Sequence, residues 1–199
     1  MATPKRVTEI PTIDVALVVI ELEDGTSYAL DTASKIGVEP QLEEEDAVKL
    51  IVKGKLKAQK PAVTTITGNT ITLTDNVFSP ELVKVLQGGT IKYWSTAEKT
   101  VETEEETEFG ISSYEPPTVG SGTKGQVFKL HAYSAQYDTA GLITQYEQIT
   151  YPNCQGSPIS LGSEDGTFRA PEYKINSAPK KTEAPYKINY VSKLPELSA

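Results

Sequence analysis

Along much of this 199-residue chain, hydrophobic and polar residues alternate with a period of two, which is the pattern of β-strands. The clearest run is Ile13 to Leu22, and the dipeptide Asp24-Gly25 follows it directly. Because Asp-Gly can occupy the two left-handed positions of a type I′ turn, we expect Thr26 to Leu30 to return as an antiparallel partner. The first thirty residues therefore predict a β-hairpin.

A second alternating run extends over about ten residues from Asp46 and is rich in lysine. Its alternation predicts one long strand with a buried apolar face and a basic face. The apolar positions are Val48, Leu50, Val52 and Leu56, and the basic positions are Lys49, Lys53, Lys55 and Lys57, with Lys60 beyond them. The basic face is interpreted either as a solvated surface or as a surface that pairs with the acidic cluster of a neighbouring molecule. A nucleic-acid strip would need interleaved aromatic residues, which this run lacks.

A threonine-rich segment and a short helical segment follow. Val63 to Thr67 and Thr70 to Asp75 flank Gly68-Asn69, and glycine at the first central position fits a type II′ hairpin turn. Next, Ser79 and Pro80 are typical of the first positions of a helix, and an apolar stripe leads from there to Gly88-Gly89. This pattern predicts a helix over about residues 80–87, which must lie on the sheet because so short a helix is marginal alone.

Residues 95–125 break the strand pattern. Between Glu98 and Glu108 lie six glutamates and one lysine, and a glycine-rich stretch follows. Such a segment buries too little apolar surface to order itself, so it is predicted to be a long acidic loop or projecting arm. It is either a partner-contacting arm or a solvated loop, and its candidate contacts are Glu102, Glu104, Glu105, Glu106 and Glu108.

The strand pattern resumes in the second half of the chain, at Gln126 to Ser134 and at Leu142 to Tyr151. From Pro152 to Val191 prolines are frequent, which suggests edge strands, and Asp165-Gly166 is a further hairpin signal. Together these patterns predict a mainly β protein, an antiparallel β-sandwich or barrel with one short flanking α-helix. We expect a single domain over residues 1–199, with flexible termini and the inserted loop 95–125.

Composition narrows the function classes. The hydrophobic fraction of 38% allows only a thin core, and no apolar run approaches the ~20 residues that cross a bilayer, so no membrane partner is expected. A single cysteine excludes an internal disulfide. The net charge of −8 argues against a generic nucleic-acid binder, because phosphate binding needs a concentrated basic surface.

Candidate chemistry is sparse. The only histidine is His131 and the only cysteine is Cys154, so a catalytic dyad is arithmetically possible, although Cys154 lacks a glycine-flanked elbow. Two such side chains are too few for a structural zinc site, and no phosphate-binding glycine motif occurs. Glutamates and aspartates cluster in mutually repelling sets, which is typical of solvated faces. We therefore expect no catalytic residue, metal or cofactor, and the protein is predicted not to be an enzyme.

Two stretches carry a family resemblance. The first is Ile66 to Ile91, "ITGNTITLTDNVFSPELVKVLQGGTI", and the second is Tyr146 to Val191, which includes "YPNCQGSPIS", "EDGTFRAPEYKINSAPKK" and "PYKINYV". Both stretches resemble the major tail protein, the tail tube protein of long-tailed bacteriophages. The acidic stretch from Glu98 to Glu108 has no counterpart in the family pattern.

The resemblance implies a structural virion protein that assembles into hexameric rings stacked as a hollow tube. It also implies a place in the virion tail, assembly in the host cytoplasm, and contact with the tape-measure protein, the tail terminator and the baseplate or tip proteins. Viral DNA would pass through the lumen without specific binding, and the family has no active site. Two alternatives stay open, a carbohydrate-binding or carbohydrate-cleaving β-sandwich and another virion component such as a head decoration protein.

Overall fold

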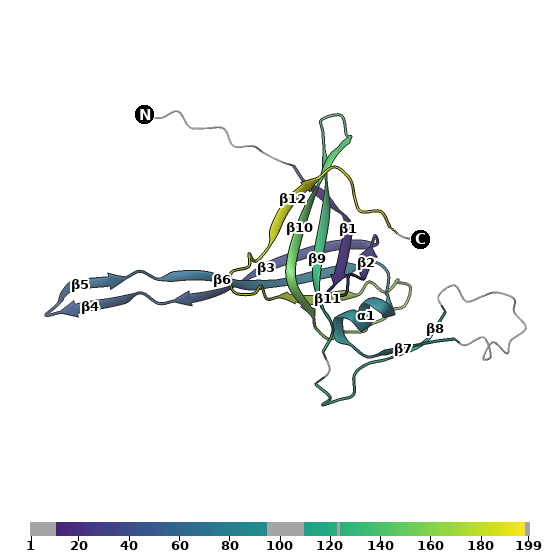
Figure 1. Ribbon diagram of the computed structural model, residues 1–199, viewed down its shortest axis with the longest axis horizontal. Helices are drawn as coiled ribbons and strands as arrows, with labels where there is room; N and C mark the ends of the chain where they lie inside the picture. Colours follow the sequence, from purple (N-terminus) through teal and green to yellow (C-terminus); the bar gives the residue numbers. More distant parts are fainter. Residues whose placement is uncertain (1–10, 95–109, 123, 198–199) are drawn as a thin grey trace, which may run out of the picture.

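The computed structural model describes residues 11–94, 110–122 and 124–197, and they form a mainly β protein (Figure 1). Within these residues, twelve strands and one helix follow one another. They are β1 (Ile13–Leu22), β2 (Ser27–Leu30), β3 (Ala33–Glu45), β4 (Val48–Val52), β5 (Lys55–Lys60), β6 (Val63–Asp75), α1 (Pro80–Gln87), β7 (Thr90–Tyr93), β8 (Ile111–Glu115), β9 (Val127–Tyr137), β10 (Ile143–Gly156), β11 (Glu172–Ser177) and β12 (Lys187–Val191).

Eight of these strands form one antiparallel sheet in the order β2-β1-β9-β10-β11-β6-β3, with β12 paired to β10 off this path. β10 joins the two halves of the sheet, because it lies between β9 and β11 in this order. Its first part also pairs with β12, and its end pairs with β11. The half with β1, β9 and β10 crosses the half with β3, β6 and β11, so that one folded sheet supplies two layers (Figure 1). Within the described strands the sheet stays open, with β2 and β3 at its ends, and no closed barrel forms.

The core lies between these layers and is closed by α1. Its fully buried side chains come from both halves of the sheet and include Ile20, Leu130, Ile71 and Tyr173. Because β1, β9, β6 and β11 each turn alternate residues inward, the period-two pattern of the sequence marks this core correctly. The predicted mainly β, antiparallel fold with one short helix is confirmed.

The helix forms where the sequence predicts it. Ser79 caps it, since its hydroxyl oxygen accepts a hydrogen bond from the Leu82 amide at 3.3 Å, and Pro80 is the first helical residue. The apolar stripe is buried, and Leu86 has no exposed surface. Gly156 on β10 allows this packing, because a Cβ there would lie 2.6 Å from the Leu86 Cα. Among the described residues, no helix is long and apolar enough to span a membrane.

Two further local predictions are confirmed. β1 and β2 form the predicted hairpin around Asp24-Gly25, but its turn is not type I′, because only Gly25, with φ of 88°, is left-handed and Asp24 is not. β9 and β10 pair around the 138–141 turn, where the Asp138 carboxylate accepts hydrogen bonds from the amides of Ala140 and Leu142 at 2.8 and 2.9 Å. Short-range turn chemistry decides both connections.

The hairpin predicted at Gly68-Asn69 is wrong, because β6 runs through it without a turn. Gly68 is needed for a close approach instead: a Cβ there would lie 2.4 Å from the carbonyl oxygen of Ser177 on β11. The Asn69 side chain donates a hydrogen bond to the Pro185 carbonyl at 2.9 Å. The dipeptide therefore serves the packing of three chain segments.

Three other predictions also need correction. The proline-rich end does not consist only of edge strands, since β11 lies between β10 and β6, with its flanking prolines outside the strand. Asp165-Gly166 lies in a turn within residues 157–171, which contain no strand. Part of the predicted loop 95–125 is ordered, because β8 pairs with β7, whereas the acidic run from Glu98 to Glu108 lies outside the described residues.

Candidate functional site

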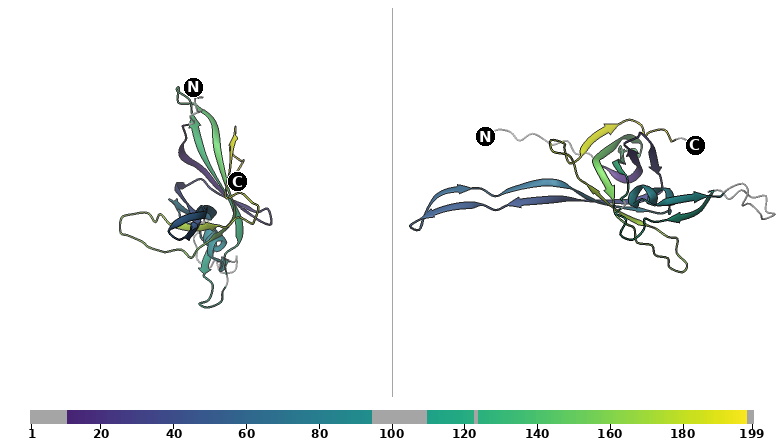
Figure 2. Two further views of the ribbon diagram at one scale, coloured as in Figure 1. Left: turned by 90° about the vertical axis from the view of Figure 1, so that its left-hand side faces the viewer. Right: turned by 60° about the horizontal axis from the view of Figure 1, so that its bottom comes forward.

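A long two-stranded arm projects from the body of the molecule, as Figure 1 and the right-hand view of Figure 2 show. It begins where β11 ends: β11 pairs with β6 only from Asn69 to Thr74, so beyond this point β3 and β6 pair only with each other. We call residues 41–46 and 63–67 the stem. The tip is residues 48–60, in which β4 and β5 pair around Lys53-Gly54, with φ of 50° and 75° at these two residues.

This hairpin corrects the prediction of one long strand with a buried face. Every residue of β4 and β5 is exposed, including the apolar positions assigned to a buried face. The lysines do not share one face either. Lys55 pairs with Val52 and Lys49 is three residues from Val52 on the same strand, so the two lysines point to opposite sides of the hairpin.

The arm exposes many large apolar side chains. Val48 is 65% exposed and Ile51 60%, and similar residues continue into the stem. The full set is Leu42, Val48, Leu50, Ile51, Val52, Leu56, Val63 and Ile66. Both faces of the arm carry some of them, because Leu42 pairs with Ile66 and Val63 pairs with Glu45 on the other side. A free two-stranded hairpin is marginally stable in water, and contiguous exposed apolar surface is typical of an interaction site.

Charge is segregated along the arm. The tip holds five lysines and no acidic residue, and the stem holds four acidic residues and no basic one. These are Lys49, Lys53, Lys55, Lys57 and Lys60 in the tip, and Glu43, Glu44, Glu45 and Asp46 in the stem. A single ion pair, Lys60 Nζ to Glu45 Oε2 at 2.5 Å, joins the two sets. The other four lysines have no hydrogen bond or ion pair within the described chain.

The structure therefore brings together Lys49, Lys53, Lys55 and Lys57, the basic residues that the sequence predicts as contacts. It says nothing of the acidic candidates Glu102, Glu104, Glu105, Glu106 and Glu108, which lie outside the described residues. Sequence reasoning missed the apolar residues of the arm as contact residues, because it assigned them to the core. Gly54 between two alternating runs is the signal that could have revealed the turn.

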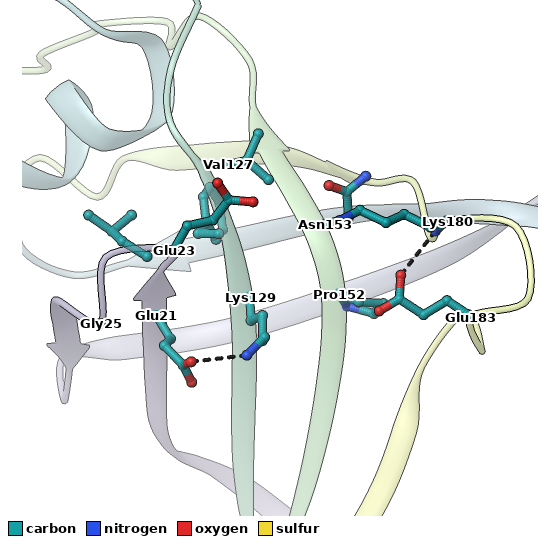
Figure 3. A pocket seen from close by; sticks show the side chains of 11 residues that line it. Glu21, Glu23, Gly25, Val127, Lys129, Pro152, Asn153, Lys180 and Glu183 are labelled. Atoms are coloured by element: carbon teal, nitrogen blue, oxygen red, sulfur yellow. Dashed lines mark hydrogen bonds and ion pairs between the residues drawn. The ribbon is translucent and has the colours of Figure 1, made fainter.

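A polar groove of about 440 Å³ lies on the body, between the ends of β1, β9 and β10 and the 180–183 segment (Figure 3). Three of its charged side chains, those of Glu21, Lys129 and Glu183, make hydrogen bonds within the chain. The Glu21 carboxylate lies 3.0 Å from Lys129 Nζ and 3.1 Å from His131 Nε2, and these two hydrogen bonds lower the pKa of Glu21, the lysine most. Glu183 accepts a hydrogen bond from the backbone amide of Lys180 at 3.0 Å. Among the described residues no group of three or more histidines, cysteines, aspartates or glutamates could hold a metal ion.

Cys154 and His131 do not form the dyad that the sequence allows. Cys154 is fully buried in the core, where its thiol donates a hydrogen bond to the Tyr151 carbonyl at 3.3 Å and burial raises its pKa to about 12. His131 lies on the opposite face of the sheet, with Nδ1 2.9 Å from the Thr150 hydroxyl. A thiol so strongly protonated, and separated by the sheet from the only histidine, is not an activated nucleophile.

Comparisons with known proteins identify no family. No model of a known protein family matches the chain, and no curated protein matches it. Among solved structures the chain is similar to a chain from the cryo-EM structure of the anti-feeding prophage baseplate. That similarity has a TM-score of 0.34 and 8% sequence identity, and it covers 98% of this chain and 100% of that one. A TM-score this low does not establish a shared fold or a shared function.

Proposed function

We propose that this chain is a structural subunit that assembles with copies of itself through its arm. The observation that carries the proposal is the arm's composition: eight large apolar side chains are at least 43% exposed, and none of them belongs to the hydrophobic core. The monomer gains no stability from such an arm, because the apolar side chains of the arm stay in water. When the arm packs against a second molecule, the same side chains leave water, and the arm gains the additional strands or side chains that stabilise a hairpin.

The body of the molecule supports the same proposal. The outer edges of β2 and β12 have no strand partner within the described residues, and β12 exposes Ile188 and Tyr190 at 44% and 48%. Open edges with apolar side chains are templates for pairing with another chain. Neighbouring copies that continue the sheet across these edges would remove them, as closed assemblies do.

The form that we propose for the assembly is a stack of hexameric rings, the tail tube of a long-tailed bacteriophage. This step rests on the resemblance of Ile66 to Ile91 and Tyr146 to Val191 to the major tail protein. The role is structural and not enzymatic, with contacts to the tape-measure, terminator and baseplate proteins and passage of DNA through the lumen. DNA must slide without sticking, so we place acidic residues on the inner wall and keep the tip lysines away from it.

Electron microscopy and analytical ultracentrifugation of the purified chain test the proposal together. Rings with a central hole, or tubes, whose abundance rises with protein concentration are the expected result. A persistent monomer at the highest soluble concentration would refute self-assembly, and binding of that monomer to a glycan array would favour the carbohydrate-binding alternative. Assembly only on the surface of capsids would favour a head decoration protein.

A further inference from the structure

The charge pattern of the arm specifies how arms of neighbouring copies pack. We propose that the tip of one arm lies along the stem of the next copy's arm, in a head-to-tail stagger, so that lysines of one copy face carboxylates of another. This inference rests on the proposed self-assembly and deepens it. It names the occupant of the exposed arm, which is the arm of a second copy of this chain.

The two charged sets of one arm are too far apart to neutralise each other. The middle of the stem strand near Glu44 and the middle of β4 near Leu50 are separated by six residues, which corresponds to ~20 Å of extended chain. The Debye length is ~8 Å at physiological ionic strength, so the attraction between these sets is largely screened. Only Glu45 and Lys60 at the junction reach each other. The remaining tip lysines and stem carboxylates are therefore free to pair with charges on another molecule.

The possible alignments of two arms differ in which charged residues they bring face to face. Side by side in register, the five lysines of one tip would face the five of the other, and the four carboxylates of one stem would face four carboxylates. A shift by half the length of the arm removes both repulsions and places the basic tip of one copy on the acidic stem of the next, which is an attraction. Juxtaposed like charges disfavour an interface, whereas complementary charges fix the register of contact.

Apolar surface is available at both halves of such a contact. The tip contributes Val48, Leu50, Ile51, Val52 and Leu56, and the stem contributes Leu42, Val63 and Ile66. Burial of these side chains supplies the attraction, and the charges decide which half meets which. In a head-to-tail stagger every arm uses its tip on one neighbour and its stem on the other, so the contact can repeat from copy to copy. That property suits a stacked assembly.

Charge inversion tests this arrangement. A tip variant, Lys55→Glu with Lys57→Glu, and a stem variant, Glu43→Lys with Glu44→Lys, each place like charges in the tip-to-stem contact. All four residues are exposed and have no partner within the described chain, so the monomer should keep its circular dichroism spectrum and melting temperature. We expect the concentration needed for assembly, measured by sedimentation, to rise at least about tenfold for each variant. In 1 M salt the difference from the wild-type chain should shrink.

Two rescue experiments identify the contact as tip to stem. The chain with all four inversions should assemble within about threefold of the wild-type concentration, because the two glutamates introduced into its tip face the two lysines introduced into the stem of the next copy. An equimolar mixture of tip and stem variants should also assemble, since each tip then faces an opposite stem. A matched control, Lys35→Glu with Lys174→Glu, makes the same change of charge on exposed sites of the sheet body and should assemble normally.

Each contrary result has a distinct meaning. The tip-to-stem contact is overturned if the tip variant assembles like the wild-type chain, or if the chain with all four inversions does not recover assembly. Self-assembly itself stands in both cases. Enhanced assembly of a mixture of wild-type chain and tip variant would show tip-to-tip packing instead. A discrete dimer as the final product would show antiparallel arms and overturn the head-to-tail stagger. A wild-type chain that never assembles refutes the proposed function, and the arm contact with it.

Discussion

Shortening the arm should abolish assembly and leave the fold of the monomer almost unchanged. Val48 and Lys60 face each other across the hairpin, so residues 49–59 can be replaced by Asn-Gly, which forms a two-residue type I′ turn between them. The ion pair between Lys60 and Glu45 is kept. The variant thus removes the four unpaired lysines and most of the apolar tip while the stem remains closed by a favourable turn.

The expected change in the free energy of unfolding follows from how deeply the altered residues are buried. Every residue of β4 and β5 is exposed, so removing most of the two strands exposes no new apolar surface, and the free energy of unfolding should change by less than about 1 kcal/mol. By contrast, Leu86→Ala empties a fully buried site beneath the helix and should cost about 2–5 kcal/mol. In a domain of this size each kcal/mol shifts the melting temperature by about 2–4 °C.

Differential scanning fluorimetry of dilute monomer, paired with sedimentation at high concentration, measures both effects. The shortened chain should melt within about 4 °C of the wild-type chain and sediment as a monomer. Leu86→Ala serves as the control with the opposite behaviour, since its loss is in stability and its arm is intact. If the shortened chain melts as early as Leu86→Ala, the arm belongs to the fold of the monomer. If it assembles normally, the arm is not the assembly element.

Further expected outcomes concern the body of the molecule. Gly156→Ala should lower the free energy of unfolding by about 1–3 kcal/mol, visible in urea titration, because its Cβ would lie 2.6 Å from the Leu86 Cα. Cys154→Ser should cost at most about 3 kcal/mol and leave assembly intact, whereas loss of a measurable activity without loss of fold would contradict the non-enzymatic role. Hydrogen bonds, the one from Lys129 most of all, lower the pKa of Glu21 from its ordinary 4.5. The contribution of Glu21 to stability is therefore present above pH 4.5 and is lost as the pH falls through the lowered pKa. In chemical denaturation, Glu21→Gln should make the free energy of unfolding depend less on pH over this acidic range. Assembled wild-type protein should not retard duplex DNA in a low-salt gel, and salt-sensitive retardation would show that basic surface remains free for phosphates.

The parts of the fold that the sequence predicts correctly are those decided by local chemistry. Gly25 supplies the left-handed residue of its own turn, and Ser79 caps the helix that begins one residue later. Gly68-Asn69 shows the limit of such reasoning. Its glycine is required by the carbonyl of Ser177, more than a hundred residues away in the sequence, so the same dipeptide that signals a turn marks a close strand contact here. Only the tertiary structure distinguishes the two uses.

For a related reason, the sequence predicts the charged residues of the candidate site but not its exposed apolar residues. The lysines of the tip are predictable because charge is visible in the sequence. The exposed apolar residues beside them are predicted to be buried, because alternation is the signature of any half-buried strand. Alternation does not say whether the covering surface belongs to the same molecule. In the monomer, Leu50 at 56% exposure contradicts the prediction.

An assembly arm must satisfy two conditions, and together they explain that contradiction. Its apolar residues have to be exposed in the free subunit and covered in the assembled one, so its sequence has to resemble that of a core strand. If arms pack tip to stem as proposed, Val48, Leu50 and Val52 become buried only in the assembly, and the period-two pattern describes the assembled state. Amide hydrogen exchange would separate the two states: β4 and β5 should exchange quickly in dilute monomer and slowly in the assembly, while β9 in the core should be protected in both. Rapid exchange of the arm in the assembled protein would mean that the pattern has no partner surface to explain it.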